Sequence, residues 1–253
     1  MIEVNRREAF LKAPDAVLFD LDNTLYPYDP AHQAAMVAVR GKIHRLFNVE
    51  GERFQEIFEV ARAEVKARLL GTAGAHSRLL YFQRAFELMG LKAQLLHALD
   101  FEHTYWRVFL SNARLFAGVR DLLDDIRLAG VPTALVTDLT AQIQFRKLVY
   151  FGLDHFFDSV VTSEESGADK PAPASFKLAL SKLQPKGDRV WFIGDSASID
   201  LAGARGAVSA TTLQKIHAGV ERGRAPDTVD AFFSDYEDLR GLLARALQGG
   251  TGA

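Results

Sequence analysis

The sequence of 253 residues contains no cysteine, which excludes disulfides, thiolate metal ligands and cysteine nucleophiles. It also lacks any apolar run near the roughly 20 residues that span a bilayer. The charged N-terminal segment has no apolar core like that of a signal peptide. A formal net charge of −2 offers no basic footprint for a nucleic acid polymer. We therefore expect a cytoplasmic protein with neither a membrane nor a nucleic acid partner, in an oligomeric state that the sequence leaves open.

Several catalytic signatures are missing as well. The seven histidines show no HExxH spacing, and the chain has no GxxxxGK[ST] loop and no complete GxGxxG. The stretch GDSAS at 194–198 lacks the second glycine of a serine hydrolase elbow. Zinc proteases, P-loop nucleotidases and serine hydrolases are therefore not expected.

What the sequence does contain is an alternation of short apolar runs and helical stretches. The runs lack polar alternation, as expected for strands buried on both faces of a parallel sheet. They cover residues 16–20, 132–137, 158–162, 189–194, 208–213 and 229–233. Helical stretches cover residues 118–129, 140–151, 173–184, 200–207 and 236–247. This order predicts an α/β fold with a doubly wound, Rossmann-like parallel sheet.

Strand signals vanish between residues 28 and 110. In their place, helical patterns cover most of the segment, and one helical stripe is formed by Phe54, Ile57, Phe58, Ala61, Val65 and Leu69. We expect an all-helical insertion at 28–110, with the α/β core formed by 1–27 and 111–253. The small-residue stretch 71–78 predicts a loop, and the tail after Gln248 is expected to be disordered.

Two pairs of aspartates follow predicted strands. Asp20 and Asp22 come directly after the first run, and Asp195 and Asp200 come after the run at 189–194. Ligands of doubly wound sheets bind beyond the carboxyl ends of the strands. Each aspartate alone could equally be a turn former or a helix N-cap. Both pairs together favour a cation site, and oxygen-only ligands favour Mg²⁺.

Two more residues suit a phosphate site at the same edge of the sheet. Thr137 ends a run, where its hydroxyl and the following N–H groups can receive a phosphate oxygen. Lys170 precedes a predicted helix, and its charge would offset both the phosphate and the aspartates. A lone lysine in a loop is usually solvated, so its position among the strand ends is what favours a function.

At these positions the sequence resembles the haloacid dehalogenase-like (HAD) superfamily. The stretch DLDNT at 20–24 resembles its first motif, Thr137 its second, Lys170 in DKPAP its third, and GDSASID at 194–200 its fourth. The resemblance spans the whole chain, with 28–110 similar to a helical, C1-type cap. It implies a Mg²⁺-dependent phosphatase, a phosphoric monoester hydrolase that forms an aspartyl-phosphate intermediate.

The resemblance also implies roles for individual residues. Asp20 would be the nucleophile and a metal ligand. Asp22 would be the general acid and base, with its backbone carbonyl ligating the metal. Thr137, Asp138 and Lys170 would hold the phosphoryl group. An asparagine is more usual at position 138, so Asp138 adds a negative charge beside the phosphate.

For the metal, the resemblance implies that Asp195 ligates Mg²⁺ and that Asp200 orients either the waters of the ion or Lys170. Asp22 argues against dehalogenation, because the dehalogenases of the superfamily lack this second aspartate. Thr24 favours hydrolysis over a phosphomutase, which stays open as an alternative, as does a non-catalytic binding protein.

The resemblance leaves the substrate broad: a small phosphorylated metabolite of the nucleotide or phosphosugar class. Tyr26, His76 and Arg78 are predicted to contact it, with Tyr26 at the entrance of the site and the other two presented by the loop at 71–78.

Overall fold

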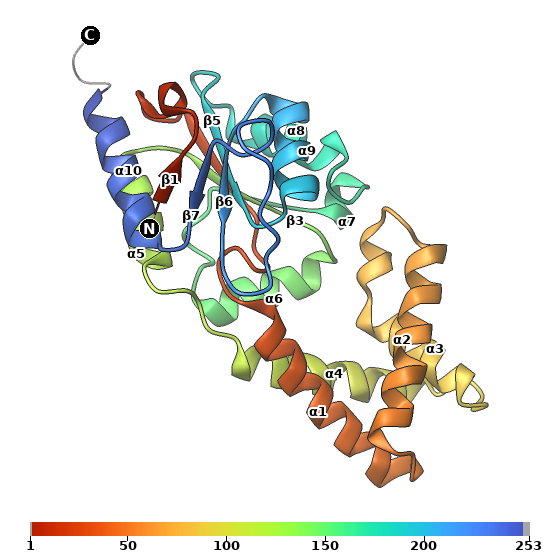
Figure 1. The fold of residues 1–253 in the computed structure, drawn as a ribbon. Helices are drawn as coiled ribbons and strands as arrows, with labels where there is room; N and C mark the ends of the chain where they lie inside the picture. The colour runs from red at the N-terminus through yellow and green to blue at the C-terminus, as the bar shows by residue number, and fades with distance from the viewer. Residues whose placement is uncertain (1, 250–253) are drawn as a thin grey trace. The chain divides into compact units, whose positions relative to one another are not determined.

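One sheet of seven strands organises the larger part of the computed structural model, which describes residues 2–249 (Figure 1). The strand order is β1-β7-β6-β5-β2-β3-β4. The strands are β1 (Ile2–Val4), β2 (Ala16–Phe19), β3 (Thr133–Thr137), β4 (Ser159–Thr162), β5 (Val190–Gly194), β6 (Thr211–Lys215) and β7 (Ala231–Phe233). All neighbouring strands pair in parallel except β1, which is antiparallel to β7. The predicted doubly wound α/β fold is confirmed.

The connections run in opposite directions from β2. The chain passes from β2 to β3 and β4 on one side, and then to β5, β6 and β7 on the other. This reversal makes a switch point beside β2, where the loops after β2, β3 and β5 leave the sheet. Ligands of such sheets bind at the carboxyl ends of the strands around this point.

Helices cover both faces of the sheet. Figure 1 shows α8 and α9 on one side of the strands and α5 and α10 on the other. The elements of this part are η1 (Arg7–Phe10), α5 (Val119–Leu128), α6 (Ala141–Phe151), α7 (Ser163–Ser166), α8 (Pro173–Leu183), a π-helical turn η3 (Ala197–Leu201), α9 (Ala202–Val208) and α10 (Tyr236–Gly249). The central strands are buried along their whole length, because their apolar side chains face helices on both sides.

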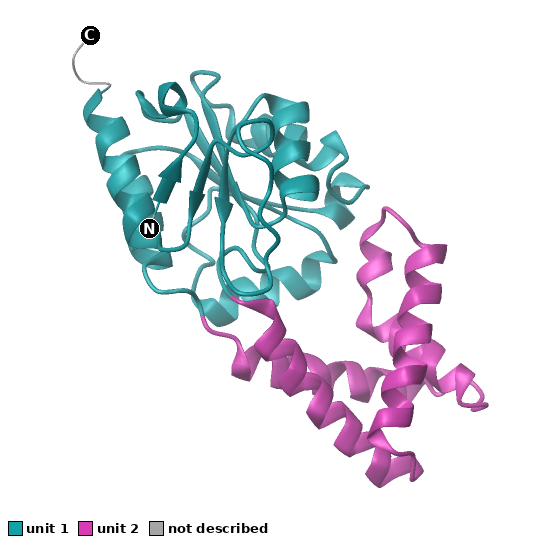
Figure 2. Cartoon of the chain, viewed as in Figure 1, with its two compact units in different colours: residues 1–26, 115–253 teal, residues 27–114 magenta. Residues whose placement is uncertain are grey.

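The chain divides into two compact units, 1–26 with 115–253 and 27–114 (Figure 2). The second unit is helical and consists of α1 (Tyr28–Phe47), α2 (Gly51–Arg68), η2 (Ala73–His76), α3 (Arg78–Leu88) and α4 (Leu95–Asn112). It has an aromatic core of its own, built by Phe54, Phe58, Phe82, Phe86 and Phe101. The expected insertion at 28–110 falls within this unit, and the segment 71–78, expected as a loop, contains the single turn η2.

Two strands differ from the sequence-based expectation. No pattern predicted β1, a three-residue edge strand in a charged segment. The strand expected at 208–213 lies at 211–215, so it ends in Gln214 and Lys215, both buried. Polar residues such as these usually indicate a loop, whereas here the side chains of Gln214 and Lys215 make hydrogen bonds inside the fold. The tail from residue 250 onward lies outside the described residues.

No helix within residues 2–249 combines the length and the apolar character needed to cross a membrane.

Candidate active site

Asp20 lies at the carboxyl end of β2 and is 5% exposed. Its Oδ1 accepts a hydrogen bond from Lys170 Nζ at 2.6 Å, and its Oδ2 accepts one from Thr24 Oγ1 at 3.0 Å. Its backbone N–H donates to the Ile193 carbonyl of β5. Burial raises the pKa of Asp20 above the ordinary carboxyl value, although Lys170 acts in the opposite direction. The bonds from Lys170 and Thr24 hold the Asp20 side chain in one orientation.

Lys170 is buried and connects two carboxylates. Its Nζ lies 2.6 Å from Asp20 and 2.7 Å from Asp200 Oδ1, and it also donates to the Val136 carbonyl at 3.2 Å. Three acceptors match the three donors of an ammonium group. The Lys170 backbone N–H donates to Asp138 Oδ1 at 2.9 Å, so the loop before α8 is bonded to the loop after β3.

Asp20, Asp195 and Asp200 together could hold a metal ion. One carboxylate oxygen from each lies within 4.8 Å of the others. Asp200 also accepts from Lys170 Nζ and from the Ser196 N–H. Burial, and then the neighbouring Asp200, raises the pKa of Asp195. Asp20 and Asp200 are buried and Asp195 is half-buried. An oxygen-only donor set with surplus negative charge fits a hard cation such as Mg²⁺.

Thr137 ends β3, and Asp138 begins the loop that follows it. Gln144 of α6 donates from Nε2 to Thr137 Oγ1 at 2.6 Å and to the Asp138 carbonyl at 2.7 Å. Thr137 Oγ1 in turn donates to the Asp138 carbonyl at 3.4 Å, so a phosphate oxygen would replace this acceptor. Leu139 follows at φ +93°, in the left-handed region that branched residues rarely adopt, and its N–H donates to Ser163 Oγ. This part of the loop is held by several bonds at once.

Asp22 lies on the turn after β2, two residues beyond Asp20, and the side chain is 32% exposed. Lys147 of α6 places Nζ 2.7 and 2.8 Å from its two carboxylate oxygens. The Tyr26 hydroxyl donates to Asp22 Oδ1. Tyr26 itself is fully buried and packs on Phe151. The structure thus places Tyr26 behind Asp22 and not at the expected entrance of the site.

Sequence reasoning missed Gln144 and Lys147. Both are fully buried polar residues on a helix whose other buried members are Ile143, Leu148 and Phe151. The sequence did contain a signal for them: both lie on an otherwise apolar helix face, one helical turn apart. Buried polar groups need partners, so such a pair indicates contacts inside the fold.

His76 and Arg78 lie together in the helical unit. Arg78 donates from Nη1 to the His76 carbonyl at 2.8 Å and from Nη2 to the Tyr28 hydroxyl. The rings of Tyr81 and Tyr105 lie 5.3 and 5.4 Å from its guanidinium carbon, within the range of a cation–π contact. Contact of His76 and Arg78 with a substrate stays a prediction.

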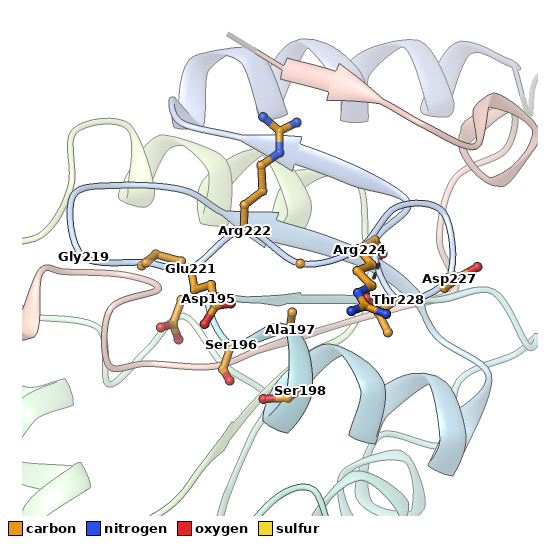
Figure 3. A pocket seen from close by; sticks show the side chains of 12 residues that line it. Asp195, Ser196, Ala197, Ser198, Gly219, Glu221, Arg222, Arg224, Asp227 and Thr228 are labelled. Carbon is orange, nitrogen blue, oxygen red and sulfur yellow. Dashed lines mark hydrogen bonds between the residues drawn. The ribbon is translucent and has the colours of Figure 1, made fainter.

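A pocket of about 640 Å³ begins at Asp195 and extends along the loop between β6 and β7 (Figure 3). Figure 3 shows Asp195 near Glu221, and Arg224 near Thr228. Gln214 holds this loop. Its Nε2 donates to the carbonyls of Asp195 (2.7 Å) and Glu221 (2.8 Å), and its Oε1 accepts from the Gly223 N–H at 2.9 Å. A Cβ at Gly223 would meet Ala197 at 2.5 Å, so this wall admits only glycine.

Comparisons with known proteins show which family this chain resembles. The family model of the haloacid dehalogenase-like hydrolases matches residues 14–207. The ribulose-1,5-bisphosphate 5-phosphatase of Halopiger xanaduensis is 39% identical over 78% of this chain and 83% of its own length. The glyceraldehyde 3-phosphate phosphatase of Methanopyrus kandleri is 30% identical over 88% of this chain and 91% of its own. In fold, the chain resembles a HAD phosphatase from Thermococcus onnurineus, with a TM-score of 0.69 and 24% identity over 90% of this chain and 97% of that one.

Proposed function

The chain belongs to the haloacid dehalogenase-like hydrolases, and on that premise we propose that it releases phosphate from a small phosphosugar with Asp20 as the nucleophile. The reaction class is hydrolysis of a phosphoric monoester. The two relatives described above are named as phosphatases of phosphorylated sugars, which favours this substrate class over nucleotides.

The observation that carries the proposal is the position of Asp20. Its two oxygens are held by Lys170 and Thr24 beside two further carboxylates. A carboxylate approaches a phosphate poorly because both are anionic, so a nearby cation must screen the approach. Lys170 supplies one such charge. Asp20, Asp195 and the Asp22 carbonyl would hold Mg²⁺, with Asp200 as an outer partner. The ion would supply further charge neutralisation.

The reaction then takes two steps. Asp20 forms a bond to phosphorus while the bond from phosphorus to the leaving oxygen breaks, and Asp22 gives its proton to that oxygen. Water next attacks the aspartyl-phosphate, Asp22 takes a proton from the water, and the bond from phosphorus to Asp20 breaks to free the phosphate. Thr137, the Asp138 backbone and Lys170 hold the phosphoryl oxygens throughout. Acid–base assistance of this kind is worth about 10²–10⁴ in rate.

The test is phosphate release from ribulose 1,5-bisphosphate, glyceraldehyde 3-phosphate and a set of nucleotides, with Mg²⁺ or EDTA. We expect release from at least one phosphosugar in Mg²⁺. Asp20→Asn preserves the side-chain shape and should reduce kcat to background. Asp154→Asn, an exposed aspartate outside the site, is the matched control and should retain full activity.

The outcomes separate the alternatives. Phosphate that is moved within the sugar and not released would establish a phosphomutase. Undiminished turnover by Asp20→Asn would refute the covalent mechanism. Tight binding of a phosphosugar with no product of either kind would establish a binding protein. His76 and Arg78 are tested in the same panel, where their substitution should raise KM for the active phosphosugar.

A further inference from the structure

One face of α6 bonds to both loops of the proposed catalytic machinery. Gln144 donates to Thr137 and to the carbonyl of Asp138, in the loop after β3. Lys147, three residues later, bonds to Asp22 in the turn after β2. Residues at i and i+3 lie on the same side of a helix. The single helix α6 therefore fixes the loop after β3 and the turn that carries Asp22 relative to each other.

The contact between Lys147 and Asp22 is buried on one side and open on the other. The Lys147 side chain is 1% exposed, whereas the Asp22 side chain is 32% exposed. The ring of Tyr26 lies 5.9 Å from Lys147 Nζ, and its hydroxyl bonds to the same carboxylate. Asp22 is thus held from behind while part of its carboxyl group remains accessible.

A buried ammonium group carries a desolvation penalty. Methionine has a similar length and would fill this position on α6 without that penalty. The contact with Asp22 therefore explains why a charged residue occupies this buried position. An ammonium group donates in three directions, so it can bond to Asp22 whether or not the carboxyl group holds a proton.

We propose that Lys147 is a positioning residue that keeps the Asp22 carboxyl group in one orientation through both steps of the reaction. The inference rests on the acid–base role of Asp22 in the proposed function. In the first step, Asp22 gives a proton to the leaving oxygen as its bond to phosphorus breaks. A strongly basic leaving oxygen needs this proton, whereas a weakly basic one departs without it. Loss of the orientation should therefore slow the first step only for esters with basic leaving groups. The value of kcat/KM reports this step, because hydrolysis of the shared aspartyl-phosphate comes after it.

The experiment compares phenyl phosphate with p-nitrophenyl phosphate, which have similar shapes and leaving groups of high and low basicity. For Lys147→Met we expect kcat/KM on phenyl phosphate to fall by about 10–100-fold, part of the contribution of a general acid. On p-nitrophenyl phosphate kcat/KM should stay within about threefold. Lys147→Arg should restore most of the loss, because a guanidinium also bonds to a carboxylate.

The matched control is Lys215→Met. Lys215 is also buried in the same unit, but it donates to the carbonyls of Ile216 and Ser234. Its removal should leave the ratio of kcat/KM on the two esters at the wild-type value. A purely structural effect of Lys147→Met would lower kcat/KM on both esters equally, and that result would overturn the inference.

Asp22→Asn separates this inference from the proposed function. If Asp22→Asn shows no preference for the better leaving group, the acid assignment itself fails. If Asp22→Asn shows that preference and Lys147→Met does not, only the positioning role fails. Crystal structures of the wild type and Lys147→Met decide the question even if neither ester is turned over. We expect the Asp22 side chain to change its orientation in the variant, and an unchanged orientation would overturn the proposal.

Discussion

Replacing Gln214 by methionine should loosen the wall of the pocket that begins at Asp195. Gln214 is fully buried on β6 and makes three bonds, to the carbonyls of Asp195 and Glu221 and from the Gly223 N–H. Methionine fills a similar volume but can make none of them. Each buried backbone group left without a partner costs about 1–3 kcal/mol. Since the pocket admits water to some of these groups, we expect a total loss of roughly 2–4 kcal/mol.

The free energy of unfolding of the core unit can be measured in urea through Trp191, which lies buried on β5. The second tryptophan, Trp106, is replaced by phenylalanine in every variant so that the signal comes from the core. Gln142→Met, at an exposed position of α6 in the same unit, is the control and should change stability by less than about 0.5 kcal/mol. A loss below about 1 kcal/mol for Gln214→Met would refute the claim that this side chain holds the loop.

Three further predictions concern charged groups. Lys170→Met leaves Asp20 and Asp200 without their shared cation, so it should abolish turnover and destabilise the metal-free protein by roughly 3–5 kcal/mol, as measured by urea unfolding in EDTA; unchanged stability would contradict the pairing. Asp138→Asn keeps the acceptor for the Lys170 N–H and removes a carboxyl group whose pKa is raised by burial. Wild-type Asp138 becomes negative as the pH rises, so the activity of the variant relative to wild type should rise with pH. A ratio that does not change with pH would contradict this. Burial, and then Arg78, lowers the pKa of His32 to about 4. The unfolded chain therefore takes up a proton that the folded chain does not, and stability should fall as the pH drops from about 6.5 toward 4. Melting temperatures of wild type and His32→Gln over this range test the point, since the fall should be smaller in the variant.

The elements that could be predicted are those whose signal lies within a single segment. The runs at 16–20, 132–137 and 189–194 are apolar throughout because helices cover both faces of their strands. The positions of Asp20, Asp195 and Thr137 followed from the same pattern, since the carboxyl ends of parallel strands meet at one edge of the sheet. The strand β1 could not be found this way, because a three-residue edge strand forms only when β7 is already in place.

Lys147 and Tyr26 illustrate what local patterns miss. The apolar face of α6 makes Lys147 unusual, but the sequence around Lys147 and Tyr26 does not indicate which residues they contact. Only the packing of α6 against the turn after β2 brings Lys147 Nζ to Asp22 and buries Tyr26 against Phe151. Gln214 is a similar case, since its three partners come from the loop after β6 and the end of β5.

The sequence by itself therefore determined the α/β fold, the separate helical segment and the carboxylates at the strand ends, because each of these is set by periodicity or by a short spacing along the chain. The tertiary structure alone decided which side chains hold those carboxylates in place. Lys147 lies 125 residues from Asp22, and Lys170 lies 150 residues from Asp20. Contacts at such separations depend on how the helices pack on the sheet, and no local pattern encodes that packing.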